Sequence, residues 1–379
     1  MELRPYQLRA VDDCAQHFLK KCEIPAIAIL PTGAGKSIII AEIIKKVGGK
    51  FLVLQPNKEI LEQNIEKYRR IGPASIYSAI LKKKEKADVV FATIGSIVYE
   101  RIFDEHRQII VDECHCVNPE AGMYQHFLGR KDIVVLGLTA TPYRLKTSGN
   151  SFMLEFITRQ RPGFFGKVIH VTQQSELLKS FYLSKLVYKE KHEVVFENVK
   201  MRGMEYCEKS LLKEFKRIKI QDLILKEIEI AEKEGKKCLV FVQFIEILQE
   251  LLKKKPSIRI LSGTTPQEER RKILEDFKEG KISTVANVGV LTTGFDYPAL
   301  NTIIIARATR SLSLWYQMCG RGQRISEGKN CCQVVDICGN LNILGDVQTL
   351  ETVLQNGSWF VTRGNQKITN KTITINKTK

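Results

Sequence analysis

Short apolar runs alternate with amphipathic stretches along the first half of the chain. Five runs are rich in β-branched residues and bounded by Gly, Pro, Asn or charged residues, which is typical of buried strands: 26–30, 51–55, 88–92, 108–111 and 133–138. Between them, apolar residues recur at helical spacing, as in 36–47 and 58–70. This alternation predicts a mostly parallel sheet with helices on both faces.

The pattern stops between residues 143 and 200, which we interpret as a connection between domains. It resumes with a long amphipathic helix over about 208–234. Five further strands are predicted, at 238–242, 258–261, 284–287, 302–306 and 332–336. The chain should therefore fold as two α/β domains, 1–190 and 200–345, followed by a tail at 346–379.

The tail has no acidic residue from Asn356 onward and is rich in Asn and Thr. This composition predicts a flexible segment or a short appended ribbon. Trp359 and Phe360, beside Arg363, could stack on a nucleic-acid base or anchor the tail to the core. We favour the anchor.

The chain carries 59 Lys and Arg against 42 Asp and Glu, a formal charge of +17. The excess is +9 over residues 1–189 and +8 over 190–379. An even excess suits a long polyanion such as nucleic acid, although many basic proteins bind none. Hydrophobic residues make up 44% of the chain, enough for ordinary cores, which excludes wholesale disorder.

No apolar stretch approaches the roughly 18–20 residues of a membrane-spanning helix, and the first residues lack the apolar core of a signal peptide. The ten cysteines include no Cys-x-x-Cys pair. Cys114 and Cys116 flank His115 but do not form such a pair. We therefore expect a cytoplasmic protein with reduced thiols and no metal site at these cysteines.

A glycine-rich segment follows the first predicted strand and opens a predicted helix, the context that a phosphate-binding loop needs. Its glycines let backbone N–H groups surround phosphates, and the helix N-terminus adds partial positive charge. Lys36 would reach the β- and γ-phosphates of a nucleotide, and the Ser37 hydroxyl would hold Mg²⁺. The segment consists of Pro31, Thr32, Gly33, Ala34, Gly35, Lys36 and Ser37.

An acidic pair, Asp112 and Glu113, ends another predicted strand. The carboxyl ends of neighbouring parallel strands face the same crevice, so this pair should face the phosphate loop. Asp112 would hold Mg²⁺, and Glu113 would orient and deprotonate the attacking water. A pair that merely caps the strand end is the alternative, and the presence of Lys36 favours the catalytic role.

Two later segments carry further polar chemistry. Thr139 and Thr141 end the next strand, where their hydroxyl groups could link the acidic pair to the second domain or simply form a strand exit. Arg321 and Arg324 lie three apart late in a predicted helix, where the small residues Gly320 and Gly322 allow close approach, and they suit a role at the developing charge on the γ-phosphate. Surface salt bridges are the alternative for these arginines. The arrangement predicts ATP between the domains, with hydrolysis driving their opening and closing.

Taken in order, these segments resemble the superfamily 2 helicases and translocases, specifically the DExH-type members. The resemblance implies two tandem RecA-like domains, ATP as substrate, Mg²⁺ as cofactor and nucleic acid as partner. Leu30 stands where a strict phosphate loop has glycine, a replacement that this superfamily often shows. The likeness runs through 3–7, 31–37, 55–58, 92–96, 112–115, 139–141, 240–243, 292–296 and 317–324.

The resemblance also implies roles for single residues. Arg4 and Gln7 match an adenine-binding motif, and Asp296 matches a residue near the ATP ribose. Gln317, Arg321 and Arg324 match the helix that senses ATP, whereas Met318 departs from members with Arg at that position. Positions that usually contact nucleic acid are matched by Lys58, Thr93 and Thr293.

Within the superfamily, the chain looks closest to RadD-type DNA-repair helicases of bacteria and to similar phage proteins. The segments that carry this likeness are 3–7, 30–37, 292–296, 320–324 and 336–340. RadD-type proteins continue into a cysteine-rich segment, but this chain has no cysteine after Cys338. We therefore expect no function that rests on that segment.

These observations predict an ATP-dependent DNA helicase or translocase in repair, recombination or replication, most simply a monomer in a bacterial or phage-infected bacterial cell. A repair or replication protein is a candidate partner, and DNA is favoured over RNA. Three alternatives stay open: an RNA helicase, a nucleotide-gated binding module without turnover, and the motor subunit of a restriction-like complex. A binding module without turnover would be expected to have lost at least one catalytic residue. All are present here, namely Lys36, Ser37, Asp112, Glu113 and Arg324.

Overall fold

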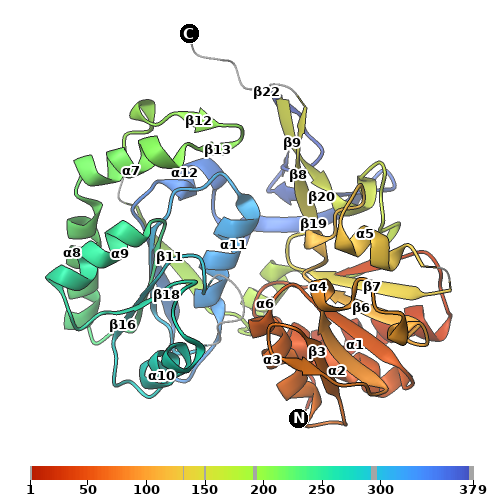
Figure 1. Ribbon diagram of the computed structural model, residues 1–379. Helices are drawn as coiled ribbons and strands as arrows, with labels where there is room; N and C mark the ends of the chain where they lie inside the picture. Colours follow the sequence, from red (N-terminus) through yellow and green to blue (C-terminus); the bar gives the residue numbers. More distant parts are fainter. Residues whose placement is uncertain (1, 131, 149–150, 191–193, 292–296, 375–379) are drawn as a thin grey trace. The chain divides into compact units, whose positions relative to one another are not determined.

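The computed structural model describes residues 2–130, 132–148, 151–190, 194–291 and 297–374. The chain divides into two compact units, Met1–Leu177 with Thr349–Lys379, and Leu178–Gln348. Each unit contains its own mostly parallel sheet with helices packed around it (Figure 1), which confirms the α/β prediction.

The sheet of the first unit has the strand order β10-β1-β7-β6-β2-β5-β3-β4. All neighbours in it are parallel except β3 and β4. Its central strands are buried along their whole length, as expected of strands covered on both faces. The bounds are β1 Ala26–Ile29, β2 Phe51–Gln55, β3 Ser75–Ser78, β4 Lys83–Lys84, β5 Val89–Thr93, β6 Gln108–Asp112, β7 Val134–Thr139 and β10 Lys167–Val171.

The helices of this unit follow the strands in alternation. Helix α1 packs against β10, β1 and β7 and against α2, while α3 packs against α2, β2, β3 and β5. Phe18 of α1 meets Phe51 of β2 edge to face at 5.1 Å. The bounds are α1 Pro5–Leu19, α2 Lys36–Val47, α3 Lys58–Tyr68, α4 Ile94–Ile97 and α5 Met123–Leu128, with short 3-10 turns at Arg101–Phe103, Cys114–Cys116 and Ile157–Arg159.

The second unit contains a parallel sheet in the order β11-β18-β17-β14-β16-β15. Its strands are β11 Lys185–Glu190, β14 Cys238–Val242, β15 Arg259–Leu261, β16 Thr284–Asn287, β17 Thr302–Ala306 and β18 Cys331–Asp336, with a separate ribbon of β12 Met201–Arg202 and β13 Glu205–Tyr206. Its helices are α7 Glu208–Arg217, α8 Ile220–Lys233, α9 Ile245–Lys254, α10 Gln267–Lys278, α11 Leu312–Gly320 and α12 Asn340–Leu344, with 3-10 turns η4 Phe196–Asn198 and η5 Arg321–Gln323. Helix α6 (Gln174–Lys179) and the 3-10 turn Val347–Thr349 span the two junctions between the units.

The single helix expected over 208–234 is wrong. Two helices, α7 and α8, meet at Lys219, whose φ of +51° ends the helical path. The apolar residues Leu211, Phe215, Ile220 and Ile224 are all buried on the two sides of this break. Because helical spacing continues across the junction, the hydrophobic pattern alone did not show the interruption.

The segment 143–200 is also not a plain connection. It forms the antiparallel hairpin β8 (Tyr143–Ser148) and β9 (Ser151–Phe156), then β10 of the first sheet and β11 of the second. Strands β10 and β11 lie at sheet edges and are only partly buried, so polar residues interrupt their apolar pattern. The structure accordingly places the junction near residue 178, rather than at the expected 190–200.

The residues expected as a basic tail form part of the first unit. Strands β19 (Leu350–Gln355), β20 (Ser358–Arg363) and β21 (Gln366–Lys367) make an antiparallel ribbon, and β22 (Ile373–Thr374) pairs with β9. Figure 1 shows this blue ribbon beside the yellow hairpin β8–β9. Both central residues of the β19–β20 turn, Asn356 and Gly357, have positive φ, the conformation that a two-residue hairpin requires.

Polar contacts of Thr369 and Asn370 join the ribbon to the hairpin. The Thr369 hydroxyl accepts a hydrogen bond from the Val361 backbone N–H at 2.9 Å. The Asn370 side chain accepts from the backbone N–H of Phe156, also at 2.9 Å, and the Asn370 N–H donates to the Leu154 carbonyl. The chain therefore closes back on its own first unit through a buried hydrogen-bond set.

Asn370→Ala should destabilise the first unit by about 1–3 kcal/mol, because the buried Phe156 N–H loses its acceptor. Urea unfolding followed by circular dichroism measures the loss. Asn365→Ala, in the exposed turn between β20 and β21, is the matched control. Equal midpoints for the two variants would contradict the assigned role of Asn370.

Candidate functional site

The phosphate-loop segment connects β1 to α2, as its sequence predicted. Gly33 and Gly35 have φ of +86° and +80°, a backbone conformation that a residue with a Cβ atom adopts only at a cost. Helix α2 begins at Lys36, directly after Gly35. The backbone N–H groups of the first turn of α2 therefore lie next to a loop that curls tightly enough to surround a phosphate.

The start of α1 lies against this loop. The Tyr6 hydroxyl donates to the Ala34 carbonyl at 2.9 Å, and the Gln7 amide donates to the same oxygen at 3.2 Å. The Gln7 side-chain oxygen, Oε1, accepts from the Arg4 backbone N–H, which ties the two predicted adenine-binding residues together. A Cβ atom on Gly35 would lie 2.7 Å from the Gln7 nitrogen. The φ of Gly35 therefore favours glycine, and the missing side chain leaves room for the Gln7 side-chain amide.

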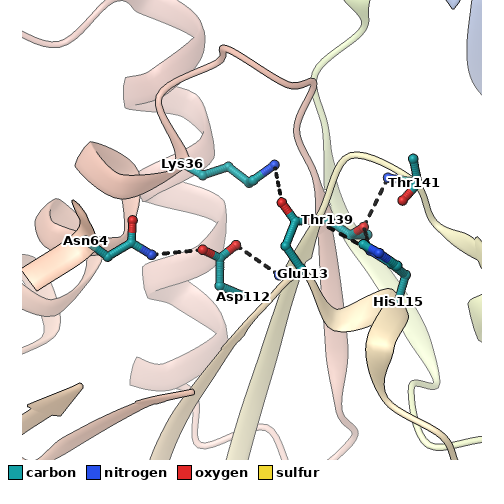
Figure 2. A network of polar contacts seen from close by, with 7 residues as sticks. All are labelled: Lys36, Asn64, Asp112, Glu113, His115, Thr139 and Thr141. Atoms are coloured by element: carbon teal, nitrogen blue, oxygen red, sulfur yellow. Dashed lines mark hydrogen bonds and ion pairs between the residues drawn. The ribbon is translucent and has the colours of Figure 1, made fainter. Parts of the chain in front are cut away.

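Figure 2 shows the acidic pair and its neighbours. Strand β6 ends at Asp112, and Glu113 turns the chain away with a φ of +50°. Lys36 Nζ lies 3.3 Å from Glu113 Oε1, and both side chains are largely buried. The structure therefore brings the phosphate-loop lysine and the acidic pair together, as the sequence predicted.

Asn64 of α3 completes this group and was not predicted. Its amide donates to Asp112 Oδ2 at 2.8 Å, while the Glu113 backbone N–H donates to Asp112 Oδ1 at 2.9 Å. Each oxygen of this nearly inaccessible carboxylate thus has a donor. Asn64 lies within a helical stretch that carries no motif, so no sequence signal marked it.

Burial and the negative charge of Glu113 raise the pKa of Asp112, while Lys36 and Asn64 act in the opposite direction. Two carboxyl groups at one buried edge repel each other, and a divalent cation would relieve that repulsion. Asp112 and Ser37 offer the hard oxygen atoms that Mg²⁺ prefers. The residues present therefore fit a nucleotide with its magnesium ion.

His115 connects the acidic pair to Thr139 and Thr141. His115 Nδ1 lies 3.0 Å from the Thr139 hydroxyl and 3.4 Å from Glu113 Oε2. The Thr141 backbone N–H donates to the Thr139 hydroxyl at 3.0 Å. Burial lowers the pKa of His115, which keeps its ring neutral at pH 7. The loop after β7 is thus hydrogen-bonded to the same cluster (Figure 2).

Two residues predicted to contact nucleic acid lie at the same edge of the first sheet. Lys58 begins α3 directly after β2, and Thr93 is the last residue of β5, the neighbour of β2. The Thr93 hydroxyl lies 2.8 Å from the hydroxyl of Ser96. Strand β6 is the other neighbour of β2. These positions and Asp112 therefore all lie at the carboxyl ends of adjacent parallel strands.

In the second unit, Gln317 lies on α11, Arg321 lies in η5, and Arg324 follows that turn. Arg321 is buried. A Cβ atom on Gly322 would lie 2.5 Å from Cys332 Sγ, so only glycine allows η5 to pack this closely against β18. The predicted residues Thr293 and Asp296 lie outside the described residues.

Lys329 holds this arginine-bearing turn and was not predicted. Its ammonium group donates to three carbonyl oxygens, those of Arg324 at 2.7 Å, Gly322 at 2.8 Å and Pro298 at 3.1 Å. Burial lowers the pKa of Lys329 to about 8. The three carbonyl dipoles replace the water that a buried ammonium loses. Lys329 therefore acts as a brace beneath Arg324.

Comparison with known proteins agrees with these observations. Residues 1–144 match the family described as the res subunit of type III restriction enzymes, and residues 216–326 match the helicase conserved C-terminal domain. The two family models and the relatives named as helicases support a superfamily 2 helicase. The expected family is thereby confirmed, and its RadD-type subdivision stays a prediction.

Two relatives illustrate the range of this helicase superfamily. A Saccharomyces cerevisiae protein named as an ATP-dependent helicase, IRC3, is 26% identical over 89% of this chain. The zebrafish (Danio rerio) XPB subunit of the general transcription and DNA repair factor IIH is 25% identical over 80%. The chain spans 51% of the length of the first relative and 40% of that of the second.

Solved structures support the fold. The chain matches the type ISP restriction-modification enzyme LlaBIII bound to DNA, with a TM-score of 0.61 and 17% identity. It also matches S. cerevisiae Dbp5 bound to RNA and ADP BeF3, with a TM-score of 0.59 and 14% identity. The matches cover 89% and 91% of this chain, and 27% and 92% of the respective proteins. These likenesses in fold confirm the prediction of two RecA-like domains.

The described residues contain neither a membrane-spanning helix nor a cluster of metal-binding side chains. No helix among them is long and apolar enough to cross a membrane. No group of three or more His, Cys, Asp or Glu side chains there could hold a metal ion. The cysteines are present as free thiols, with Cys14, Cys114 and Cys238 among the buried ones.

Lys329→Met should destabilise the second unit by about 1–3 kcal/mol, because buried carbonyls lose their donor. Thermal and urea unfolding of the full chain measure the change. Lys226→Met, on the exposed side of α8, is the matched control. A loss no larger than that of the control would show that Lys329 does not brace the turn.

Proposed function

We propose that the chain is an ATP-dependent DNA helicase or translocase, in which hydrolysis at the Lys36–Asp112–Glu113 site drives movement on DNA or its remodelling. The observation that carries the proposal is the buried contact between a phosphate-loop lysine and a carboxylate beside a second, hydrogen-bonded carboxylate (Figure 2). Burying a lysine and two carboxylates together is energetically costly, and such clusters are typical of sites that bind a ligand or catalyse a reaction.

The residues of the first unit divide the work of binding ATP. The backbone N–H groups of the loop and Lys36 would hold the β- and γ-phosphates. Ser37 and Asp112 would hold Mg²⁺, which when bound neutralises charge on the phosphate oxygens. Arg4 and Gln7 would contact the base, as the family resemblance implies. Gln7 lies against the loop, and the Arg4 backbone N–H donates to the Gln7 side chain.

Lys36 changes its partner during the proposed cycle. In the structure its ammonium lies beside Glu113, and a bound γ-phosphate would attract it more strongly because it carries more negative charge. Glu113 would then turn to the attacking water and accept its proton. Gln317, Arg321 and Arg324 keep their predicted role at the γ-phosphate, which rests on the family resemblance and on the position of Lys329 beneath the turn.

The proposed nucleic-acid path on the first unit runs over Lys58 and Thr93 at the edge of β2 and β5. DNA is preferred over RNA as the substrate because the family model of residues 1–144 is that of a restriction-enzyme subunit, and a relative is named for DNA repair. One neighbour in fold binds RNA, so an RNA helicase is the second candidate. Phosphate contacts carry little information about the sugar, which leaves the choice to experiment.

Finer parts of the proposal follow from the likeness to RadD-type proteins. They are a role in DNA repair, recombination or replication, a monomeric motor, and a repair or replication protein as partner. A motor subunit of a restriction-like complex is the alternative, favoured by the match of residues 1–144. Co-purification of a nuclease subunit would distinguish the two.

Single-stranded DNA should stimulate steady-state ATP hydrolysis by the full chain. Lys36→Ala and Glu113→Gln should each lower the stimulated rate by about 100-fold or more, because each removes a group that acts on the transferred phosphoryl or the attacking water. Lys45→Ala on the same helix and Glu120→Gln on the nearby surface are matched controls. Hydrolysis that DNA does not stimulate, or that survives Lys36→Ala, would refute the motor. Stronger stimulation by RNA at equal salt would favour the RNA helicase.

Asn64→Ala should raise the Mg²⁺ concentration needed for half-maximal hydrolysis by about 10-fold, because the buried Asp112 carboxylate loses an orienting donor. A titration of MgCl₂ at saturating ATP and DNA measures the shift. Asn118→Ala, on the loop after β6, is the control because its side-chain oxygen accepts a hydrogen bond from the Glu120 backbone N–H. An unchanged Mg²⁺ dependence would remove Asn64 from the site.

A further inference from the structure

A basic cavity of about 440 Å³ lies in the first unit, away from the phosphate loop. Its lining includes three cationic side chains, two hydroxyl groups and one indole: Arg159, Arg161, Lys167, Thr158, Ser358 and Trp359. No Asp or Glu belongs to the lining. The cavity thus combines strong positive charge with an aromatic surface, and the proposed ATP chemistry uses none of it.

Two segments almost 200 residues apart build this cavity. Arg159 and Arg161 lie between β9 and β10, and Lys167 is the first residue of β10. Ser358 and Trp359 begin β20, directly after the tight Asn356–Gly357 turn. The cavity therefore exists only because the C-terminal ribbon folds back onto the first unit.

Phe360, the neighbour of Trp359, anchors the ribbon in this position. Its buried ring lies 5.5 Å from the Arg159 guanidinium and 3.9 Å from Lys367 Nζ. The Trp359 carbonyl accepts from the Asn370 amide at 3.5 Å. Phe360 thus fulfils the anchoring role expected of the pair, whereas Trp359 is only partly buried and borders the cavity.

The charges around the cavity leave its positive character in place. Lys167 donates to Cys22 Sγ at 2.8 Å, and this contact lowers the pKa of the Cys22 thiol. The nearest carboxylate along the chain, Glu155, is buried and pairs with Lys146 at 3.3 Å. Arg159 and Arg161 are exposed to solvent.

The cavity lies at the opposite end of the sheet from the proposed ATP site. Strands β1 and β10 are parallel, and Lys167 is paired with Ala26, the first residue of β1. The phosphate loop follows the last residue of the same strand, Ile29. Four residues of strand separate the two ends, about 13 Å at 3.3 Å per residue. A ligand here is therefore a second ligand, distinct from the bound nucleotide.

We infer that this cavity binds one nucleotide unit of single-stranded nucleic acid, with the base stacked on Trp359 and the backbone phosphates held by Arg159, Arg161 and Lys167. Guanidinium groups bind phosphate oxygens in pairs, and an indole ring provides a stacking surface for any base. An unpaired strand is required because a base inside a duplex cannot reach the indole. The inference rests on the proposed function only for its nucleic-acid substrate.

Tryptophan fluorescence provides a direct test, because the chain has only two tryptophans and the other, Trp315, is fully buried. A dT12 oligonucleotide added without ATP should quench the emission of the full chain, and Trp359→Phe should abolish that quenching. The Arg159→Ala/Arg161→Ala double variant should bind dT12 about 10-fold more weakly. The slope of log affinity against log salt concentration should also fall by about one for each phosphate contact that is lost. Lys272→Ala, on the exposed face of α10, is the matched control.

The inference is overturned if dT12 causes no quenching, if quenching persists in Trp359→Phe, or if the double variant binds like Lys272→Ala. Equal quenching by thymidine monophosphate would also overturn it, since a strand would not be required. The same titration on Lys36→Ala separates this site from the motor. If dT12 quenches the emission but DNA does not stimulate ATP hydrolysis by the unmodified chain, the proposed motor activity is refuted and the proposed binding site in the cavity is retained. Circular dichroism melting shows that each variant is folded.

Discussion

The buried carboxylate of Asp112 is the constraint on which the first unit depends. A charge removed from water is stable only if other groups replace the lost hydration. Asn64 and the Glu113 backbone N–H supply hydrogen bonds, and Lys36 supplies the opposite charge beside Glu113. These partners come from α3, the β6 exit and the start of α2. The parallel sheet brings them together because the carboxyl ends of its strands share one edge.

The same sheet carries different chemistry at its two ends. Acidic and hydroxyl groups gather where β1, β6 and β7 end, whereas cations and an indole gather where β10 begins. The C-terminal ribbon supplies the indole and is joined to the β8–β9 hairpin through Asn370. The last segment of the chain thus belongs to the first unit and shapes its surface there.

The second unit uses a related principle at its arginine-bearing turn. Gly322 allows η5 to approach β18, and Lys329 donates to the carbonyl oxygens of Gly322 and Arg324. Arg324 is thereby held at the end of a braced loop. A long, positively charged side chain is an uncommon choice inside a protein, and here the three carbonyl oxygens compensate for its burial.

The sequence by itself determined the central strands of both sheets, the phosphate loop, the acidic pair and the family. Each of these has a signal in residues that are adjacent along the chain, such as an apolar run, a glycine-rich turn or a motif. It did not reveal the break at Lys219, since helical spacing continues across it, nor strands β10 and β11, whose edge positions mix polar with apolar residues. Only the tertiary structure placed Asn64 on Asp112, Lys329 under Arg324, and Trp359 and Arg159 in the lining of one cavity. The contact of Asn64 with Asp112 joins residues 48 apart along the chain, and that of Lys329 with Arg324 joins residues 5 apart. The sequence pattern around each of these residues resembles an ordinary helix, loop or strand. These contacts are decided by the packing of whole elements, which no local pattern records.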